Sequence, residues 1–204
     1  MERKSLLFQK IFRRIEFIIW KSIFVCFYRS SFSKMGENVY IGHPLKLEGH
    51  GGISVGSEAI ILPLAWLACL PLLEGVNPSL EIGAGTYIGR SAHIIAIKHV
   101  RIGDKVLIAD RVYISDNVHG YEDPTRPIIE QQVVLKGDVE IGDGSWLGEN
   151  TCVIGAKIGV HCVIGANSVV TRDIPDYSVA VGAPARIIKR WDAQSGAWVK
   201  VGAK

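Results

Sequence analysis

The stretch IGDGSWLGENTCVIGAKIGVHCVIGANSVV, residues 141–170, sets an aliphatic side chain at every sixth position within each of two runs. The same spacing recurs earlier in the chain, so that four triplets share one period. Their members are Ile82, Ile88 and Ile94; Ile102, Ile108 and Ile114; Ile141, Leu147 and Val153; and Ile158, Ile164 and Val170. Glycine directly follows seven of these twelve residues. Self-similarity at a fixed period indicates a repeat architecture.

The period has a simple physical meaning, because three hexads make one triangular coil of three short strands and three corners. The aliphatic residue points inward and stacks on its equivalents at the strand spacing of about 4.8 Å. The fifth place of the hexad is small or β-branched at Ala92, Val106, Val112, Val118, Ser145, Thr151, Cys162 and Ser168. Gly, Asn and Asp beside the corners tolerate the left-handed backbone angles of sharp turns. The repeat predicts an all-β solenoid stabilised by stacking between coils, without setting its handedness.

The 204 residues carry a formal net charge of +3, and this charge is unevenly distributed. Residues 1–34 hold eight Lys or Arg and two Glu, a net charge of +6, which leaves the rest of the chain at −3. A mildly acidic body lacks the basic surface that nucleic-acid binding needs. We expect three parts: an N-terminal helical arm at 1–34, a solenoid domain at 35–186 and a C-terminal tail at 187–204.

Residues 5–32 are expected to form an amphipathic helix, since apolar side chains recur there at three- and four-residue steps. One face carries Leu7, Phe8, Ile11, Phe12, Ile15, Ile18 and Ile19, and the other carries Lys10, Arg13, Arg14 and Lys21. Such a helix either packs on the protein's own body or a neighbouring subunit, or rests on anionic lipid. Charges interrupt the apolar run, which excludes a typical signal peptide and a membrane span. We expect a cytoplasmic protein, and the lipid alternative places it at the inner face of the cell membrane.

The cysteines and histidines show no pattern typical of a metal site. The thiols are expected to be buried in a reducing compartment, and they are Cys26, Cys69, Cys152 and Cys162. Zinc catalysis on such a solenoid would need a histidine triad across an interface. His93 and His99 lie one hexad apart, so they project from neighbouring faces. We therefore expect no metal.

The repeat is clearly interrupted between His119 and about Val134, where the period fails and two prolines occur. Interruptions of a solenoid map to loops, often on the binding face. His119 stands where the coil gives way to this extruded loop, next to Asp116 and Asn117. Histidine suits proton transfer near neutral pH, so His119 is the candidate general base. Asp116 either orients its ring or caps a corner.

Several segments resemble one family. SDNVHGYEDP, residues 115–124, resembles the D-x-x-H-x-Y-x-D-P-type segment of bacterial polysaccharide O-acetyltransferases. WLGENT (146–151), IGANSVVTRDIP (164–175) and VGAPARIIK (181–189) are similar to the C-terminal coils of those enzymes. The resemblance covers about half of the chain and implies the left-handed parallel β-helix of the hexapeptide-repeat acyltransferase superfamily. It implies that His119 is the general base and that Trp146 lies close to the acetyl group and the acceptor.

The resemblance also implies the substrates. It implies direct transfer from acetyl-CoA, as co-substrate, to a sugar hydroxyl of a bacterial surface polysaccharide or its precursor. Acetyl-CoA is expected in a groove between two subunits of a homotrimer, so the partners are a sugar or oligosaccharide and further copies of the chain. Six residues are expected to bind it: Gly148 and Ala166 along the pantetheine arm, Thr171 and Arg172 at its end, and Arg186 and Lys189 at the phosphates.

Two alternatives stay open beside O-acetylation. Acetylation of an amino sugar's nitrogen is the nearest, because acceptor choice depends on loop geometry that a sequence does not show. A non-catalytic scaffold or glycan-binding module is the other, because the fold alone would permit it. A scaffold would not need His119, Trp146 and the C-terminal basic pair together, which favours the enzyme.

Overall fold

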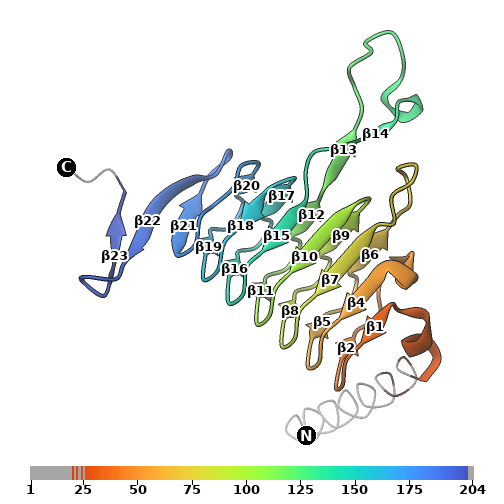
Figure 1. The fold of residues 1–204 in the computed structure, drawn as a ribbon, viewed down its shortest axis with the longest axis horizontal. Coiled ribbons are helices and arrows are strands. Elements are labelled where there is room, and N and C mark those ends of the chain that lie inside the picture. The colour runs from red at the N-terminus through yellow and green to blue at the C-terminus, as the bar shows by residue number, and fades with distance from the viewer. Residues whose placement is uncertain (1–19, 21, 23, 25, 202–204) are drawn as a thin grey trace, which may run out of the picture.

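The computed structural model describes residues 20, 22, 24 and 26–201, and shows a stack of triangular coils (Figure 1). Each full coil gives one strand to each of three parallel sheets, called A, B and C in the order in which the chain visits them. Successive coils pair in register, as Ile82, Ile102 and Ile141 do in sheet A. The fold is a left-handed parallel β-helix, which confirms the fold that the resemblance implied.

The strands are short, and the corners between them form the edges of the prism. Sheet A holds β1 (Lys34–Met35), β4 (Ile53–Val55), β7 (Ser79–Ile82), β10 (His99–Ile102), β15 (Val139–Ile141) and β18 (Lys157–Ile158). Sheet B holds β2 (Tyr40–Ile41), β5 (Ile60–Ile61), β8 (Tyr87–Ile88), β11 (Leu107–Ile108), β16 (Trp146–Leu147), β19 (Val163–Ile164), β21 (Ser178–Val181), β22 (Arg186–Asp192) and β23 (Ala197–Lys200). Sheet C holds β3 (Lys46–Glu48), β6 (Trp66–Cys69), β9 (His93–Ala96), β12 (Tyr113–Ser115), β17 (Cys152–Ile154) and β20 (Val169–Val170). Three 3-10 turns are η1 (Arg29–Ser31), η2 (His50–Gly52) and η3 (Ile128–Glu130).

The core is the interior of the coil. All twelve aliphatic residues of the repeat are at most 3% exposed, as the period predicts. The small fifth-place residues leave room beside them, and Ser145 shows how a polar one is tolerated. Its Oγ donates to the Gly159 carbonyl at 2.8 Å and accepts the Cys162 N–H at 2.9 Å. A buried hydroxyl with both partners is not penalised. Val118 departs from the pattern because it has left the coil for another strand.

The glycines that follow the aliphatic residues are needed for a reason other than the predicted one. None of these seven glycines has a positive φ. Instead, the neighbouring coil passes too close for any side chain. A Cβ on Gly83 would lie 2.3 Å from the Gly103 carbonyl oxygen, and one on Gly148 would lie 2.6 Å from the Ala166 nitrogen. Positive φ occurs at other corner positions, such as Asn38 and Ser91.

The extruded loop is a β-hairpin inserted between sheets C and A. Strand β13 (Asn117–His119) pairs antiparallel with β14 (Val133–Leu135). The predicted loop, 119–134, is therefore corrected to a hairpin that begins two residues earlier and ends one residue later. Its tip is held by Gln131, whose Nε2 donates to the carbonyls of Asp123 at 2.9 Å and Arg126 at 3.1 Å. In Figure 1 the hairpin rises from the upper edge of the coil, and β16 lies at the lower edge.

Both ends of the chain add to the coil. The first described residues are helical: Trp20, Ser22, Phe24 and 26–28. The sequence predicts a helix at 5–32, and its other residues up to residue 25 lie outside the described part of the chain. Phe24 is buried against the first coils, and the Trp20 indole N–H donates to the Ile41 carbonyl at 2.8 Å. At the other end, part of the predicted tail forms β22 and β23, which extend sheet B: β22 pairs antiparallel with β21, and β23 pairs antiparallel with β22. Within the described part of the chain, no helix has the length and apolar character needed to cross a bilayer.

Candidate active site

The hairpin that carries His119 is anchored by Asp116, which is fully buried at its base. The Asp116 carboxylate accepts the backbone N–H groups of Ile97 at 3.0 Å, Lys98 at 2.7 Å and His99 at 3.0 Å. It also accepts the Asn117 side-chain amide at 2.7 Å. Charge-assisted bonds of this kind are strong, so Asp116 fixes the corner from which the hairpin leaves. These contacts support the capping alternative, and the orienting role of Asp116 stays a prediction.

His119 lies at the end of β13, opposite Val133, and its side chain is exposed. The next residue holds the backbone in place, because the Gly120 N–H donates to the Gln132 carbonyl at 2.9 Å. A Cβ on Gly120 would lie 2.5 Å from that same oxygen. A paired backbone and an exposed imidazole put His119, the predicted general base, on a rigid support where solvent reaches it.

Trp146 lies on the opposite side of the molecule. It belongs to β16 in sheet B, where it pairs in register with Leu107 and Val163, and its side chain is 47% exposed. The hairpin leaves from the corner between sheets C and A, and that corner is opposite sheet B in a triangular coil. A single copy of the chain therefore does not bring His119 and Trp146 together.

Gly148 and Ala166 stack on each other at the corner between sheets B and C, the B–C corner. The two coils pack closely here, since a Cβ on Gly148 would meet the Ala166 backbone; Gly148 is buried and Ala166 is exposed. Arg186 begins β22 opposite Val181, the last residue of β21, and is exposed. Lys189 pairs with Val179 further along β22. These four predicted acetyl-CoA residues therefore lie on sheet B or its B–C corner.

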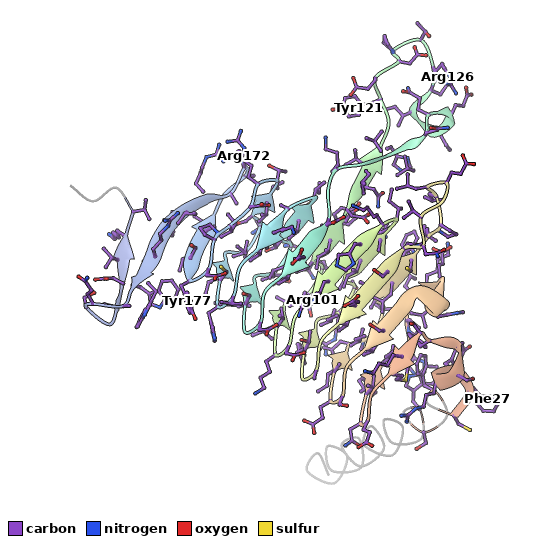
Figure 2. All side chains as sticks on the ribbon, viewed as in Figure 1. Phe27, Arg101, Tyr121, Arg126, Arg172 and Tyr177 are labelled. Atoms are coloured by element: carbon purple, nitrogen blue, oxygen red, sulfur yellow. The ribbon has the colours of Figure 1, made fainter. Side chains whose placement is uncertain are left out.

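Thr171 and Arg172 lie elsewhere, at the corner between sheets C and A, which we call the C–A corner. They follow β20 of sheet C and precede Ile174, which bridges to Ile158 in sheet A. Both are exposed. Figure 2 shows Arg172 on the same edge as the hairpin residues Tyr121 and Arg126. The predicted site residues thus fall into two groups, one at the C–A corner and one on sheet B with its B–C corner.

The structure also bears on metal and thiol chemistry. His93 and His99 project from sheets C and A, and the described residues contain no cluster of three side chains able to hold a metal ion. Cys69 and Cys162 are buried and Cys152 is half-buried, but the expected burial of Cys26 is wrong, because that residue is exposed. Burial raises the pKa of the Cys69 thiol to about 11 and also raises the pKa of Cys152 and Cys162. A thiol in this state is a poor nucleophile and metal ligand.

Sheet C carries an aromatic ladder that the sequence reasoning missed. The rings of Trp66 and His93 stack with centroids 4.1 Å apart, and Tyr113 meets His93 edge-on at 5.3 Å. Above Trp66 lies the Lys46 ammonium, 5.0 Å from the ring, and the Trp66 N–H donates to Glu48 at 3.0 Å. The signal was available, because these residues recur at intervals of about one coil. The His93 Nε2 is buried without a hydrogen-bond partner.

This ladder predicts a pH-dependent stability. Burial lowers the pKa of His93 below its ordinary value of 6.5. The unfolded chain therefore binds a proton more readily than the native one, and stability is lost as the pH falls below about 6.5. The rings of Trp66 and Tyr113 face His93, and the Lys46–Glu48 pair lies beyond Trp66. We expect the Tm of the wild type to fall more on acidification than that of His93→Phe, followed by circular dichroism. Parallel curves would contradict this.

Known proteins were compared with the chain. No model of a protein family matches it. The chain is 40% identical over 122 residues to a probable acetyltransferase of Mycobacterium tuberculosis, covering 57% of this chain and 40% of that protein. It is 42% identical over 115 residues to a putative lipopolysaccharide biosynthesis O-acetyl transferase of Escherichia coli, covering 53% and 59%. The chain therefore spans about half the length of the curated relatives it matches.

A solved structure shares the fold. An N-acyltransferase from Bacillus cereus in complex with dTDP and 3-hydroxybutyryl-CoA has a TM-score of 0.67 at 21% identity, covering 82% of this chain and 87% of that one. The coil with its inserted hairpin is therefore a parallel β-solenoid, the fold shared with this structure. The matched relatives carry the name acetyltransferase, and the chain is similar to them over 122 and 115 residues.

Proposed function

We propose that the protein is an acetyl-CoA-dependent O-acetyltransferase that acts on a sugar hydroxyl of a bacterial surface polysaccharide or its precursor. One observation carries the proposal: the candidate residues form two groups, one at the C–A corner and the other on sheet B with its B–C corner. His119, Thr171 and Arg172 lie at the C–A corner, and Gly148 and Ala166 lie at the B–C corner. The names of the relatives agree with acetyl transfer, and the Escherichia coli relative agrees with a polysaccharide acceptor.

The two groups meet when copies of the chain assemble around an axis that runs parallel to the long axis of the solenoid. In such a ring, the C–A corner of one copy faces the B–C corner of the next, and every copy uses both of its corners. His119 of one copy then comes close to Trp146 and Gly148 of another. The family resemblance makes this ring a homotrimer with three equivalent grooves.

The proposed groove has a suitable contact surface for the pantetheine arm of acetyl-CoA and positive charge for its phosphates. The small, exposed side chain of Ala166 lets the pantetheine arm approach the backbone beside the buried Gly148. Arg172, Arg186 and Lys189 supply positive charge for the phosphates. The Bacillus cereus protein of the same fold holds an acyl-CoA.

The mechanism is a direct transfer. The His119 imidazole accepts the proton of the acceptor hydroxyl while the hydroxyl oxygen attacks the thioester carbonyl, and it returns the proton to the departing thiolate. The tetrahedral oxyanion needs an N–H donor. The Gly148 N–H already donates to the Ile164 carbonyl at 2.8 Å, which excludes it from this role. The exposed indole N–H of Trp146 is therefore the candidate donor.

The test is release of free thiol from acetyl-CoA over a panel of sugars, amino sugars and oligosaccharides. The proposal expects acceptor-dependent release, with the acetyl group on oxygen and labile to mild base. Base-stable acetylation confined to amino sugars would establish the N-acetyltransferase alternative instead. The absence of release with every acceptor would leave a glycan-binding solenoid as the better account.

The amphipathic arm is proposed to rest on anionic lipid at the inner face of the membrane. Removing residues 2–18 should abolish co-sedimentation with anionic vesicles, because the apolar and basic faces are lost together. The truncation keeps Trp20 and Phe24, whose contacts with the first coils hold that end of the fold. The Tm should therefore stay unchanged, which makes it the internal control. Undiminished sedimentation would show that the arm packs on protein.

A further inference from the structure

One position of the coil carries a residue that its local structure does not favour. At the B–C corner, the second to sixth coils each place a residue with positive φ, at Leu64, Ser91, Arg111, Asn150 and Asn167. These five residues are structurally equivalent, because the backbone N–H of each donates a hydrogen bond to a carbonyl of the preceding coil. Among the described non-glycine residues with positive φ, Leu64 alone is aliphatic. Asparagine tolerates this conformation better than leucine does.

Leu64 is also exposed, so packing does not explain it. Its side chain is 53% exposed, and that of Leu45, at the same corner of the preceding coil, is 67% exposed. The two lie side by side, because the Leu64 N–H donates to His43 and the Leu45 N–H donates to Ala65. Beyond them lies Trp20, whose ring contacts that of His43 in a tilted arrangement with centroids 3.8 Å apart. The B–C corner is therefore apolar in its first two coils.

The same corner becomes polar closer to the proposed transfer site. Arg90 pairs with Asp110, and Arg111 donates to Asn150 at 2.9 Å and pairs with Glu149. Gly148 and Ala166 follow in the last coils. Three coil steps separate the level of Leu64 from that of Gly148, roughly 14 Å at the strand spacing. Along one edge the order is thus apolar, polar, and then the expected acetyl-CoA wall.

The opposite wall of the proposed groove, formed by the neighbouring copy, is also apolar at the level of the leucines. In the ring, the C–A corner of the neighbouring copy faces this edge. At the level of the second and third coils that corner carries the insertion 70–78, with Leu72 53% exposed. Acetyl-CoA is expected to occupy the groove on the C-terminal side of His119. The acceptor must then enter from the N-terminal side, past Leu72, Leu64 and Leu45.

We propose that the acceptor is an amphiphile, a sugar joined to a hydrocarbon chain, and that Leu45 and Leu64 bind the chain. This rests on the proposed function, which fixes the direction from which the acceptor comes. The sugar lies against the polar coils within reach of His119. The chain lies along the leucines toward the N-terminal arm, where a lipid surface would receive its end.

The experiment compares two glycosides of one sugar, methyl and octyl, below the micelle concentration of the octyl compound. Burying two or more methylene groups is enough to lower KM by about tenfold. We expect the wild type to show this preference without a change in kcat. Leu64→Asn should lose the preference and keep the methyl glycoside KM, with a Tm equal to or above that of the wild type. The matched control is Tyr177→Asn, which changes an exposed residue of positive φ at the A–B corner.

The outcomes separate this inference from the proposed function. Equal KM values for both glycosides in the wild type overturn the inference and leave the acetyltransferase standing. If neither glycoside is acetylated, the proposed function fails, and calorimetric binding of the octyl glycoside decides the inference, since Leu64→Asn must weaken it. Loss of vesicle binding in Leu64→Asn with an unchanged octyl preference would assign the leucines to a bilayer surface and contradict the proposal.

Discussion

Replacing His119 by alanine is expected to lower kcat by about 100-fold or more, with little change in the KM for acetyl-CoA. In the proposed mechanism, the imidazole takes the proton from the acceptor. Its loss removes an interaction made in the transition state and leaves donor binding intact. The side chain is exposed at the end of β13, so the variant should keep the fold and the Tm of the wild type. Thiol release under saturating acceptor measures the effect.

The matched control is His161→Asn, at the A–B corner and away from both corners that border sheet C. His161 is exposed and has a positive φ, which asparagine adopts readily. This variant should keep near-full activity. Near-full activity in His119→Ala would refute the assignment of the general base, whatever the control shows.

The coil was predictable because the six-residue period of the aliphatic side chains determines where each strand lies. Each inward Ile, Leu or Val at a six-residue interval marks a strand, and each strand fixes the following corner. The reason for the glycines was not predictable in the same way. A close approach between coils and a left-handed turn both select glycine, and the spacing does not separate them. The limits of the hairpin were also missed, because Asn117 and Val118 continue the repeat in sequence and pair with β14 in space.

The candidate site was predictable residue by residue, and its division between two corners was not. A sequence assigns Gly148 and Arg172 to turns but does not show that these turns lie on different edges of the prism. Asp116 illustrates a second limit, since a sequence does not show which distant groups a side chain contacts. Asp116 is adjacent to the hairpin in sequence, but its carboxylate accepts hydrogen bonds from backbone N–H groups of the preceding coil. Leu64 could have been found from the sequence, since it occupies the same position in its coil as Ser91, Arg111 and Asn150 occupy in theirs.

The central claim is that catalysis takes place between copies, and complementation between two inactive variants tests it most directly. The first variant is His119→Ala, which spoils the C–A corner. The second is Trp146→Ala on sheet B, with Ala166→Trp at the B–C corner as a further variant that blocks the proposed pantetheine contact. Ala166 is exposed, so a larger side chain there leaves the coil intact.

The two variants are co-expressed with different affinity tags, and trimers that carry both tags are purified. Each hybrid trimer then holds one groove in which an intact His119 faces an intact B–C corner. The account predicts that the hybrids recover about a third of wild-type activity, because one groove of three is complete. Hybrids no more active than either variant alone would contradict it and place the whole site within a single chain.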